Sequence, residues 1–85
     1  MKEFNYTIKD ALGIHARPAG ELVKLVKSCG CTVNVGKGEK FANANKIFGL
    51  MGLGVKQGDV VTFRVEGDNE EEAAAKIEEF MNANL

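Results

Sequence analysis

The sequence predicts an α+β fold, a two-layer open-faced sandwich in which three helices cover one face of a four-stranded antiparallel sheet. Two observations lead to this prediction. Short runs of alternating apolar and polar residues, typical of half-buried strands, are interspersed with segments whose apolar residues recur at helical spacing. The chain has 85 residues, which favours a single domain. We expect residues 1–85 to form it in the order β-α-β-β-α-β-α.

Four segments are predicted to be strands: residues 2–8, 32–36, 39–42 and 60–66. Residues 2–8, 32–36 and 60–66 alternate between apolar and polar side chains. Residues 36–38 supply the Gly-Lys-Gly expected of a hairpin turn, and residues 39–42 are the strand that returns from it. A hairpin requires antiparallel pairing of the two strands that it joins. The residues expected to face the core are Phe4, Tyr6, Ile8, Val33, Val35, Val61, Phe63 and Val65.

Three segments are predicted to be helices. The first begins near Arg17 or Pro18, because proline suits a first turn, and it ends at Gly30. The second is short and covers residues 46–53, and the third covers residues 70–82. Each long helix has one apolar stripe, formed by Ala19, Leu22, Val23 and Val26 in the first and by Ala73, Ala74, Ile77, Phe80 and Met81 in the last.

Charge and hydropathy disfavour several classes of protein. Lys and Arg number 11 against 12 Asp and Glu, for a net charge of −1, whereas nucleic-acid-binding domains usually carry a basic surplus. The longest weakly polar run, residues 47–55, is about half of the ~20 residues that a membrane-spanning helix needs. Residues 1–10 lack the apolar run of a signal peptide. We therefore expect no nucleic-acid partner and no membrane insertion.

The two cysteines indicate reduced thiols. Only Gly30 separates Cys29 from Cys31, so a disulfide between them would be strained. A single histidine without a second cysteine pair is a poor zinc ligand set. Reduced thiols are typical of a cytoplasmic protein, and we expect neither a metal nor another cofactor. A redox switch is the alternative interpretation of the pair.

The most informative segment is the loop of residues 13–19, which reads Gly-Ile-His-Ala-Arg-Pro-Ala. It places the only histidine, His15, directly before a helix whose first turn contains Pro18. Unpaired N–H groups at a helix N-terminus bind anions, phosphate above all, and Arg17 adds a guanidinium. A neutral imidazole nitrogen is a nucleophile. The pattern therefore indicates phosphoryl transfer, a reaction that depends on positioning and charge neutralisation.

His15 also has simpler interpretations. An isolated histidine is often only a polar loop residue or a helix cap. A metal site lacks a second histidine or cysteine at ligand spacing. A hydrolase triad is disfavoured, because Ser28 is the only serine and no pattern connects it to His15.

Taken together, the motifs resemble those of the HPr family, the histidine-containing phosphocarriers of the bacterial sugar phosphotransferase system. Residues 13–19 match the family's active-site signature. Residues 47–54, with the sequence IFGLMGLG, resemble its second signature around a short helix. The resemblance covers essentially the whole chain, and it implies the same order of helices and strands.

The resemblance also implies a role for each residue of the histidine loop. His15 would accept a phosphoryl group on Nδ1 from phosphorylated enzyme I and pass it to sugar-specific IIA domains. Arg17 would neutralise the phosphate, and the N–H groups of Ala16 and Arg17 would donate hydrogen bonds to it. Pro18 would hold the start of the helix. Such a protein is expected to be a monomeric carrier, not an enzyme.

A docking patch is predicted on the short helix. Ile47, Phe48 and Met51 belong to a helix with apolar residues all round, which is too short to bury every side. The simpler interpretation of such apolar residues is that they belong to the hydrophobic core, and we expect this for Leu50 and Leu53. The resemblance implies that the patch docks enzyme I and the IIA domains. The neighbouring rim would come from Gly20, Lys24 and Lys27 of the first long helix. The simpler interpretation of Lys24 and Lys27 is that they are solvated surface charges.

Lys46 departs from the family pattern. The family commonly has a serine there, which an HPr kinase/phosphorylase phosphorylates in many Gram-positive members. Lysine forms no phosphate ester and has no side-chain acceptor for capping a helix, so we expect Asn45 or Asn43 to provide the cap. The regulatory branch of the family's function is therefore in doubt, whereas the phosphorelay needs no hydroxyl at this position.

The leading hypothesis is thus a phosphocarrier of the phosphotransferase system. The alternative is an HPr-like regulatory module that binds a partner without relaying phosphate, but such a protein would be expected to lack the histidine. An RNA-binding α+β domain would require exposed aromatic residues on the sheet and a basic surplus. The aromatic residues Phe4, Tyr6 and Phe63 are instead predicted to face inward.

Overall fold

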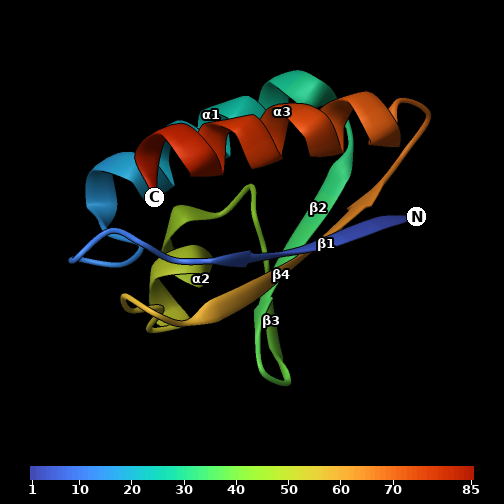
Figure 1. The fold of residues 1–85 in the computed structure, drawn as a ribbon. Coiled ribbons are helices and arrows are strands. Elements are labelled where there is room, and N and C mark those ends of the chain that lie inside the picture. The colour runs from blue at the N-terminus through green and yellow to red at the C-terminus, as the bar shows by residue number, and fades with distance from the viewer.

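The computed structural model describes residues 1–85 and shows four strands and three helices (Figure 1). Their order confirms the predicted β-α-β-β-α-β-α arrangement and the α+β class. The elements are β1 (Lys2–Thr7), α1 (Ala16–Cys29), β2 (Thr32–Lys37), β3 (Lys40–Asn43), α2 (Ile47–Gly52), β4 (Val60–Glu66) and α3 (Glu70–Asn84).

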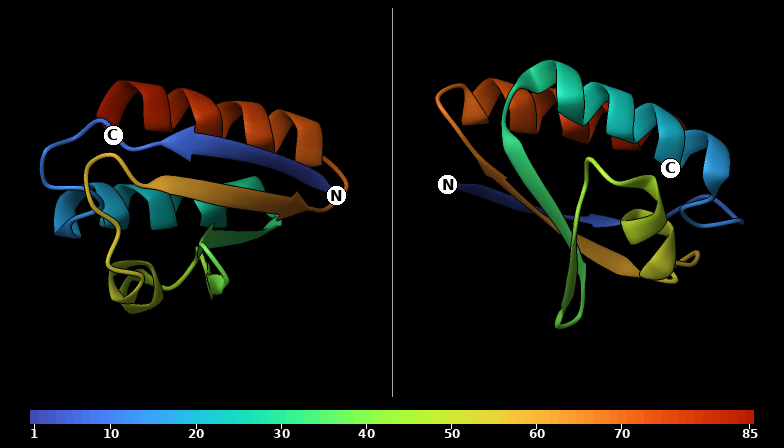
Figure 2. Two further views of the ribbon diagram at one scale, coloured as in Figure 1. Left: turned by 60° about the horizontal axis from the view of Figure 1, so that its bottom comes forward. Right: turned by 180° about the vertical axis from the view of Figure 1, so that it is seen from behind.

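The sheet is antiparallel throughout, with the strand order β1-β4-β2-β3. Helices α1 and α3 lie side by side across it, as Figures 1 and 2 show. Burial alternates along the strands as predicted, since Val61, Phe63 and Val65 of β4 are fully buried while Arg64 between them is exposed. The ring of Phe63 stacks on that of Phe4 in β1, with ring centroids 4.9 Å apart.

The other face of the sheet is polar and open to solvent. Arg64 forms a 2.7 Å ion pair with Glu3 and lies over the ring of Phe41, 4.2 Å from its centroid. Beside them the Thr62 hydroxyl donates a 2.8 Å hydrogen bond to Asn5 Oδ1. Side chains on this face therefore contact one another across the strands while staying exposed to solvent, and the helices cover the apolar face.

The long helices differ from the prediction only at their ends. α1 begins at Ala16, one or two residues early, and it ends at Gly30, whose φ of 71° is the left-handed conformation that glycine adopts readily. α3 continues two residues beyond residue 82, to Asn84. Its apolar stripe is buried apart from Phe80, which is half-buried. The local signals thus located both helices to within two residues at either end.

The predicted turn of the central hairpin is wrong by two residues. The turn is formed by Gly38 and Glu39, and residues 36 and 37 belong to β2. Gly36 pairs with Phe41 across the ladder, and a Cβ at this glycine would lie 2.4 Å from the Phe41 ring. The glycine is therefore needed for the close approach of an aromatic ring rather than for a turn.

Helix α2 is one residue shorter at each end than predicted. No side chain caps it, so the expectation that Asn45 or Asn43 does so is wrong. Instead, Asn43 Oδ1 accepts a 3.0 Å hydrogen bond from the Asn45 N–H, which closes the turn before the helix. Leu50 and Leu53 are buried, as expected.

The two cysteines are free thiols. Cys29 and Cys31 are not joined by a disulfide, and the Cys31 thiol donates a hydrogen bond to Asn69 Oδ1 at 2.8 Å. The structure contains no group of three or more His, Cys, Asp or Glu side chains suited to a metal ion. None of its helices has the length and apolar character needed to cross a membrane.

Candidate functional site

His15 is the N-cap of α1. Its backbone is extended, with φ −117° and ψ 177°, and its carbonyl accepts the first bond of the helix from the Ala19 N–H at 2.9 Å. The imidazole makes no capping hydrogen bond, and its side chain is 36% exposed. The ring is therefore held at the start of a helix, open to a second molecule.

Two backbone N–H groups beside the imidazole have no partner within the protein. An α-helix leaves its first N–H groups unpaired. Here the Ala19 N–H is used by His15 and Pro18 has none, so Ala16 and Arg17 carry the unpaired donors. They are the two N–H groups to which the family resemblance assigns the phosphate, and they lie at the positive end of the helix dipole.

The Arg17 side chain adds positive charge at the same place. It is exposed and takes part in none of the ion pairs or side-chain hydrogen bonds of the structure. Pro18, in contrast, is buried and packs the first turn onto the fold. The site thus combines a nucleophilic ring, two backbone donors and a guanidinium without an internal counterion, which together suit a phosphoryl group.

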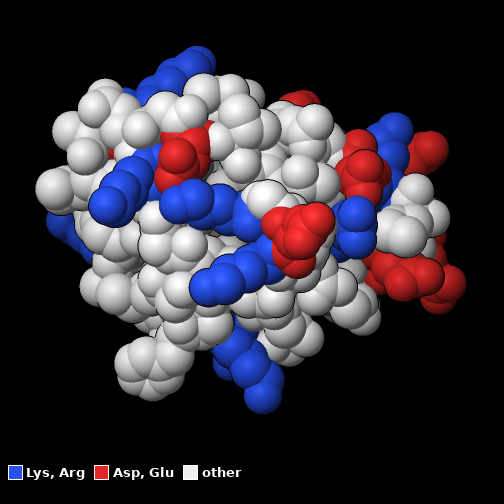
Figure 3. Space-filling model, turned by 90° about the horizontal axis from the view of Figure 1, so that it is seen from below, with Lys and Arg blue, Asp and Glu red and all other residues white.

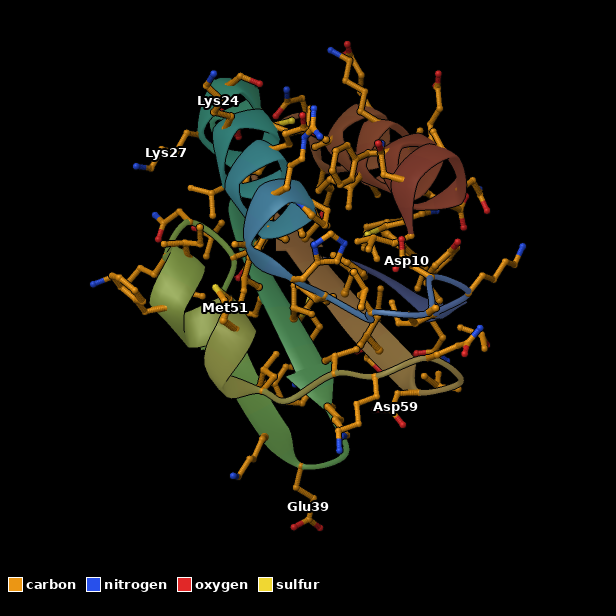
Figure 4. All side chains as sticks on the ribbon, turned by 90° about the vertical axis from the view of Figure 1, so that its left-hand side faces the viewer. Asp10, Lys24, Lys27, Glu39, Met51 and Asp59 are labelled. Atoms are coloured by element: carbon orange, nitrogen blue, oxygen red, sulfur yellow. The ribbon has the colours of Figure 1, made fainter.

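A carboxylate that sequence reasoning missed lies next to the imidazole. Asp10 Oδ1 is 3.9 Å from His15 Nε2, and the same oxygen accepts a 2.8 Å hydrogen bond from the Leu12 N–H. The backbone N–H of Asp10 is bonded to the Leu85 carbonyl at 2.9 Å. Figure 4 shows Asp10 in the loop before α1, close to the end of α3. No sequence pattern predicts this contact, because the chain's C-terminus helps to fix it.

A shallow polar depression of about 290 Å³ surrounds these groups. It brings α1 and the end of α3 together with the loop before α1, so it is assembled from both ends of the chain. The depression is lined by Asp10, His15, Arg17, Pro18, Glu21 and Asn84. Glu21 and Asn84 lie at its edge, and neither forms an ion pair or a hydrogen bond with the imidazole.

The loop that carries His15 rests on the loop between α2 and β4. The Ile14 N–H donates to the Val55 carbonyl at 3.3 Å, and Gly13 passes so close that a Cβ there would lie 2.2 Å from the same oxygen. Gly13 also has a φ of +67°, which other residues rarely adopt. Both packing and backbone conformation therefore require glycine at position 13, two residues before His15.

Lys37 and Asp59 fasten that second loop. Lys37 Nζ donates to the Gly54 carbonyl at 3.0 Å and forms a 3.0 Å ion pair with Asp59. The Lys56 N–H donates to Asp59 Oδ2 at 2.9 Å. This backbone hydrogen bond first, and the Lys37 ammonium second, hold the pKa of Asp59 below its ordinary value.

The predicted docking patch is exposed only in part. Phe48 and Met51 on α2 are 86% and 41% exposed. Ile47 is half-buried and packs toward Gly20 of α1, where a Cβ would lie 3.7 Å from Ile47 Cδ1. Gly20 and Ile47 therefore support the patch by joining α1 to α2, and Phe48 and Met51 form its exposed surface.

Lysines of α1 flank the patch. Lys24 and Lys27 are exposed, and Figure 4 shows them extending from α1 on the side where Met51 lies. An open groove of about 570 Å³ separates α1 from the start of α2, lined by Lys27, Asn45, Lys46, Ile47, Phe48 and Gly49.

Figure 3 shows Lys and Arg side chains spread across one face, with acidic side chains gathered mainly at one end. The near-zero net charge therefore conceals an uneven surface.

Comparison with known proteins identifies the family. The family model described as "PTS HPr component phosphorylation site" matches residues 2–83. The chain belongs to the HPr family. It is 45% identical over 73 residues to the phosphocarrier protein HPr of Lysinibacillus sphaericus, covering 86% of this chain and 83% of that protein. Its function is therefore that of a phosphocarrier of the phosphotransferase system, and no finding favours the regulatory module.

Solved structures of HPr proteins have the same fold. The structure of HPr-C-His from Thermoanaerobacter tengcongensis superposes with a TM-score of 0.92 at 41% identity, covering 98% of this chain and 93% of that one. A structure described as an HPr dimer from the same organism gives a TM-score of 0.76 at the same identity, covering 98% and 95%. HPr proteins are therefore not uniformly monomeric in the solid state.

Proposed function

We propose that His15 is the residue on which this chain carries the phosphoryl group, and that Nδ1 is the reacting atom. The observation that carries the proposal is the position of the ring at the N-cap of α1, beside the unpaired N–H groups of Ala16 and Arg17. The Nε2 edge of the ring faces Asp10, which leaves the Nδ1 edge for an incoming phosphorus atom.

The transfer needs no chemistry beyond positioning and charge. The Nδ1 lone pair attacks phosphorus, the bond between phosphorus and the donor's nitrogen breaks, and that electron pair returns to the donor. The N–H groups of Ala16 and Arg17 donate to the phosphoryl oxygens while the Arg17 guanidinium offsets their charge. The same steps in reverse hand the group to the acceptor protein. The chain is thus a protein substrate of other enzymes, and it requires no cofactor of its own.

Two partners follow from this role: phosphorylated enzyme I as donor and the IIA domains as acceptors. The exposed Phe48 and Met51 beside Lys24 and Lys27 support a docking surface for both. An apolar patch with a flexible methionine and a basic rim suits a carrier that must bind unrelated acidic surfaces in turn. Half-buried Ile47, packed on Gly20, sets the angle between the two helices that present the patch.

We propose that the chain acts in the cytoplasm, where it carries phosphate between enzyme I and sugar permeases. It does so as a single domain of residues 1–85 built on one apolar core. We propose that the monomer is the working form, because one copy contains every group of the site. Light scattering across a range of protein concentrations tests this, and a dimer at micromolar concentration would contradict it.

The test of the reactive residue is incubation with enzyme I and phosphoenolpyruvate, followed by intact-mass measurement. One added phosphate is expected, and acid should remove it, because phosphorus–nitrogen bonds of phosphohistidine are acid-labile. His15→Ala should take no phosphate while keeping the circular dichroism of the parent. Phosphate that persists on this folded variant would assign the transfer to another residue.

A further inference from the structure

The contact between Asp10 and His15 has a chemical consequence that rests on the proposed reaction at Nδ1. Asp10 Oδ1 faces Nε2 at 3.9 Å, which is an ion-pair contact rather than a hydrogen bond. The two side chains are 31% and 36% exposed, so solvent weakens the contact without removing it. A carboxylate at this position attracts a proton on Nε2 and repels a lone pair there.

The Asp10 carboxylate is held in place by the backbone. Its Oδ1 accepts from the Leu12 N–H at 2.8 Å, and its own N–H is bonded to the Leu85 carbonyl at 2.9 Å. The preceding N–H, of Lys9, is bonded to the same carbonyl at 2.7 Å. The carboxylate is therefore fixed by contacts close in sequence and by the C-terminal end of the chain.

We propose that Asp10 is a positioning residue, which keeps His15 in the tautomer with hydrogen on Nε2 and a free lone pair on Nδ1. When the Nδ1–phosphorus bond forms and the donor's nitrogen–phosphorus bond breaks, the His15 ring acquires a positive charge shared with Nε2–H. That charge develops facing Asp10, so the carboxylate stabilises the phosphorylated ring more than the free one. When the group leaves, the charge is lost and the ring returns to the same tautomer.

Other charged groups near the ring are arranged differently. Arg17 lines the depression and serves the phosphate, and Asn84 from α3 is neutral. Glu21 also lines the depression, but it has no ion pair with His15. Glu21 is therefore the matched control for Asp10, because its removal changes the local charge by the same amount without removing the contact to Nε2.

Two variants separate the roles of the Asp10 side chain. Asp10→Asn keeps an oxygen for the Leu12 N–H and removes the negative charge, so the loop is retained. Asp10→Ala removes both. If Asp10 acts only as a loop constituent, the asparagine variant should behave as the parent. If the charge orients the ring, both variants should show the same defect.

The first measurement is the tautomer of His15 in the unphosphorylated protein, from ¹⁵N chemical shifts in alkaline solution where imidazole is neutral. The Nε2–H form should dominate in the parent and in Glu21→Ala, and its population should fall in both Asp10 variants. This readout needs no phosphoryl transfer. It therefore stays informative if the parent proves to take no phosphate from enzyme I, a result that would reject the proposed function instead.

The second measurement is the rate of phosphoryl transfer from enzyme I. Asp10→Asn should lower the maximal rate about fivefold, the upper value for a partly exposed ion pair, and leave KM unchanged because the docking patch is untouched. Parental rate or parental tautomer in Asp10→Asn would overturn the proposal. An equal loss in Glu21→Ala would also overturn it, since the effect would then come from overall charge.

Discussion

Backbone hydrogen bonds join the loop that carries His15 to the loop between α2 and β4, whereas the first N–H groups of α1 and the exposed side chains of α2 have no partners within the protein. The loops of residues 8–14 and 53–59 share hydrogen bonds from the Ile14 N–H to Val55 O and from the Gly58 N–H to Ile8 O. At the start of α1 the N–H groups of Ala16 and Arg17 are unpaired, and on α2 the side chain of Phe48 is 86% exposed.

The difference separates residues that hold the site from residues that use it. Unpaired donors and exposed aromatic side chains cost stability, and they persist where a second molecule completes them. Substitutions of buried or internally bonded residues should therefore change the free energy of unfolding, whereas substitutions of exposed, unpaired residues should change phosphoryl transfer and partner binding.

The largest contrast is between two phenylalanines. Phe63→Ala empties a fully buried site and should cost about 3–5 kcal/mol of unfolding free energy. Phe48→Ala should leave that free energy within about 0.5 kcal/mol and weaken enzyme I binding by more than ~1 kcal/mol. Urea unfolding and calorimetric titration measure the two quantities. Strong destabilisation by Phe48→Ala would place this residue in the supporting region.

Two glycines with nearly equal φ angles, Gly13 and Gly38, test how much a close contact adds to backbone strain. Gly13→Ala should cost about 3 kcal/mol, since its Cβ would meet the Val55 carbonyl and its φ is +67°. Gly38→Ala, at φ +63° with no neighbour within 4 Å, should cost only about 1 kcal/mol. Thermal unfolding of the two variants provides the comparison. Equal losses would show that the contact with Val55 contributes nothing.

Arg17 tests the functional side. Arg17→Ala should change the free energy of unfolding by no more than about 0.5 kcal/mol, because the side chain is exposed and unpaired. Phosphoryl transfer should slow by the equivalent of about 1–3 kcal/mol, as for a lost charged hydrogen bond. Stopped-flow or quenched transfer assays measure the rate. A variant that unfolds instead would show that Arg17 is structural.

Lys46 lies at the border between the groove and α2. We expect no ATP-dependent phosphorylation of the chain by an HPr kinase, whereas Lys46→Ser should gain acid-stable phosphate at residue 46. The substitution itself should change partner binding by only about 0–1 kcal/mol, as for an exposed charge. Kinase assays with mass mapping test this. Acid-stable phosphate on the parent would restore the regulatory role.

We expect the smallest effect from Asp59, whose contribution to the free energy of unfolding depends on pH. Its pKa is lower in the folded protein, chiefly through the Lys56 N–H and then Lys37, so its ionised form stabilises the fold. That contribution is complete above the ordinary aspartate pKa of about 3.9 and is lost as the pH falls toward the lowered value. Asp59→Asn should flatten this part of the stability curve. Denaturant midpoints between pH 2 and 6 would detect it, and an unchanged slope would contradict it.

Local signals in the sequence were sufficient for much of this molecule. Periodicity located three strands and the two long helices, since the burial of one face repeats every two residues in a strand and at helical spacing in a helix. The short helix and the returning strand of the hairpin followed from segment length and from the glycines around them. Proline and glycine marked the ends of α1. Because a helix start always leaves N–H groups unpaired, an anion site beside His15 was predictable without tertiary contacts, whereas the assignment of the donors to Ala16 and Arg17 came from the family resemblance.

The tertiary structure decided everything that depends on residues distant in the chain. Gly36 reads locally as a turn, yet it belongs to β2 because Phe41 crosses it. Ile47 reads as part of the exposed patch, yet it is half-buried because α1 approaches α2 at Gly20. Asp10 faces His15 in a loop that is bonded to Leu85 at the other end of the chain. Such contacts have no period or spacing in the sequence, because the folding of the whole chain brings their partners together.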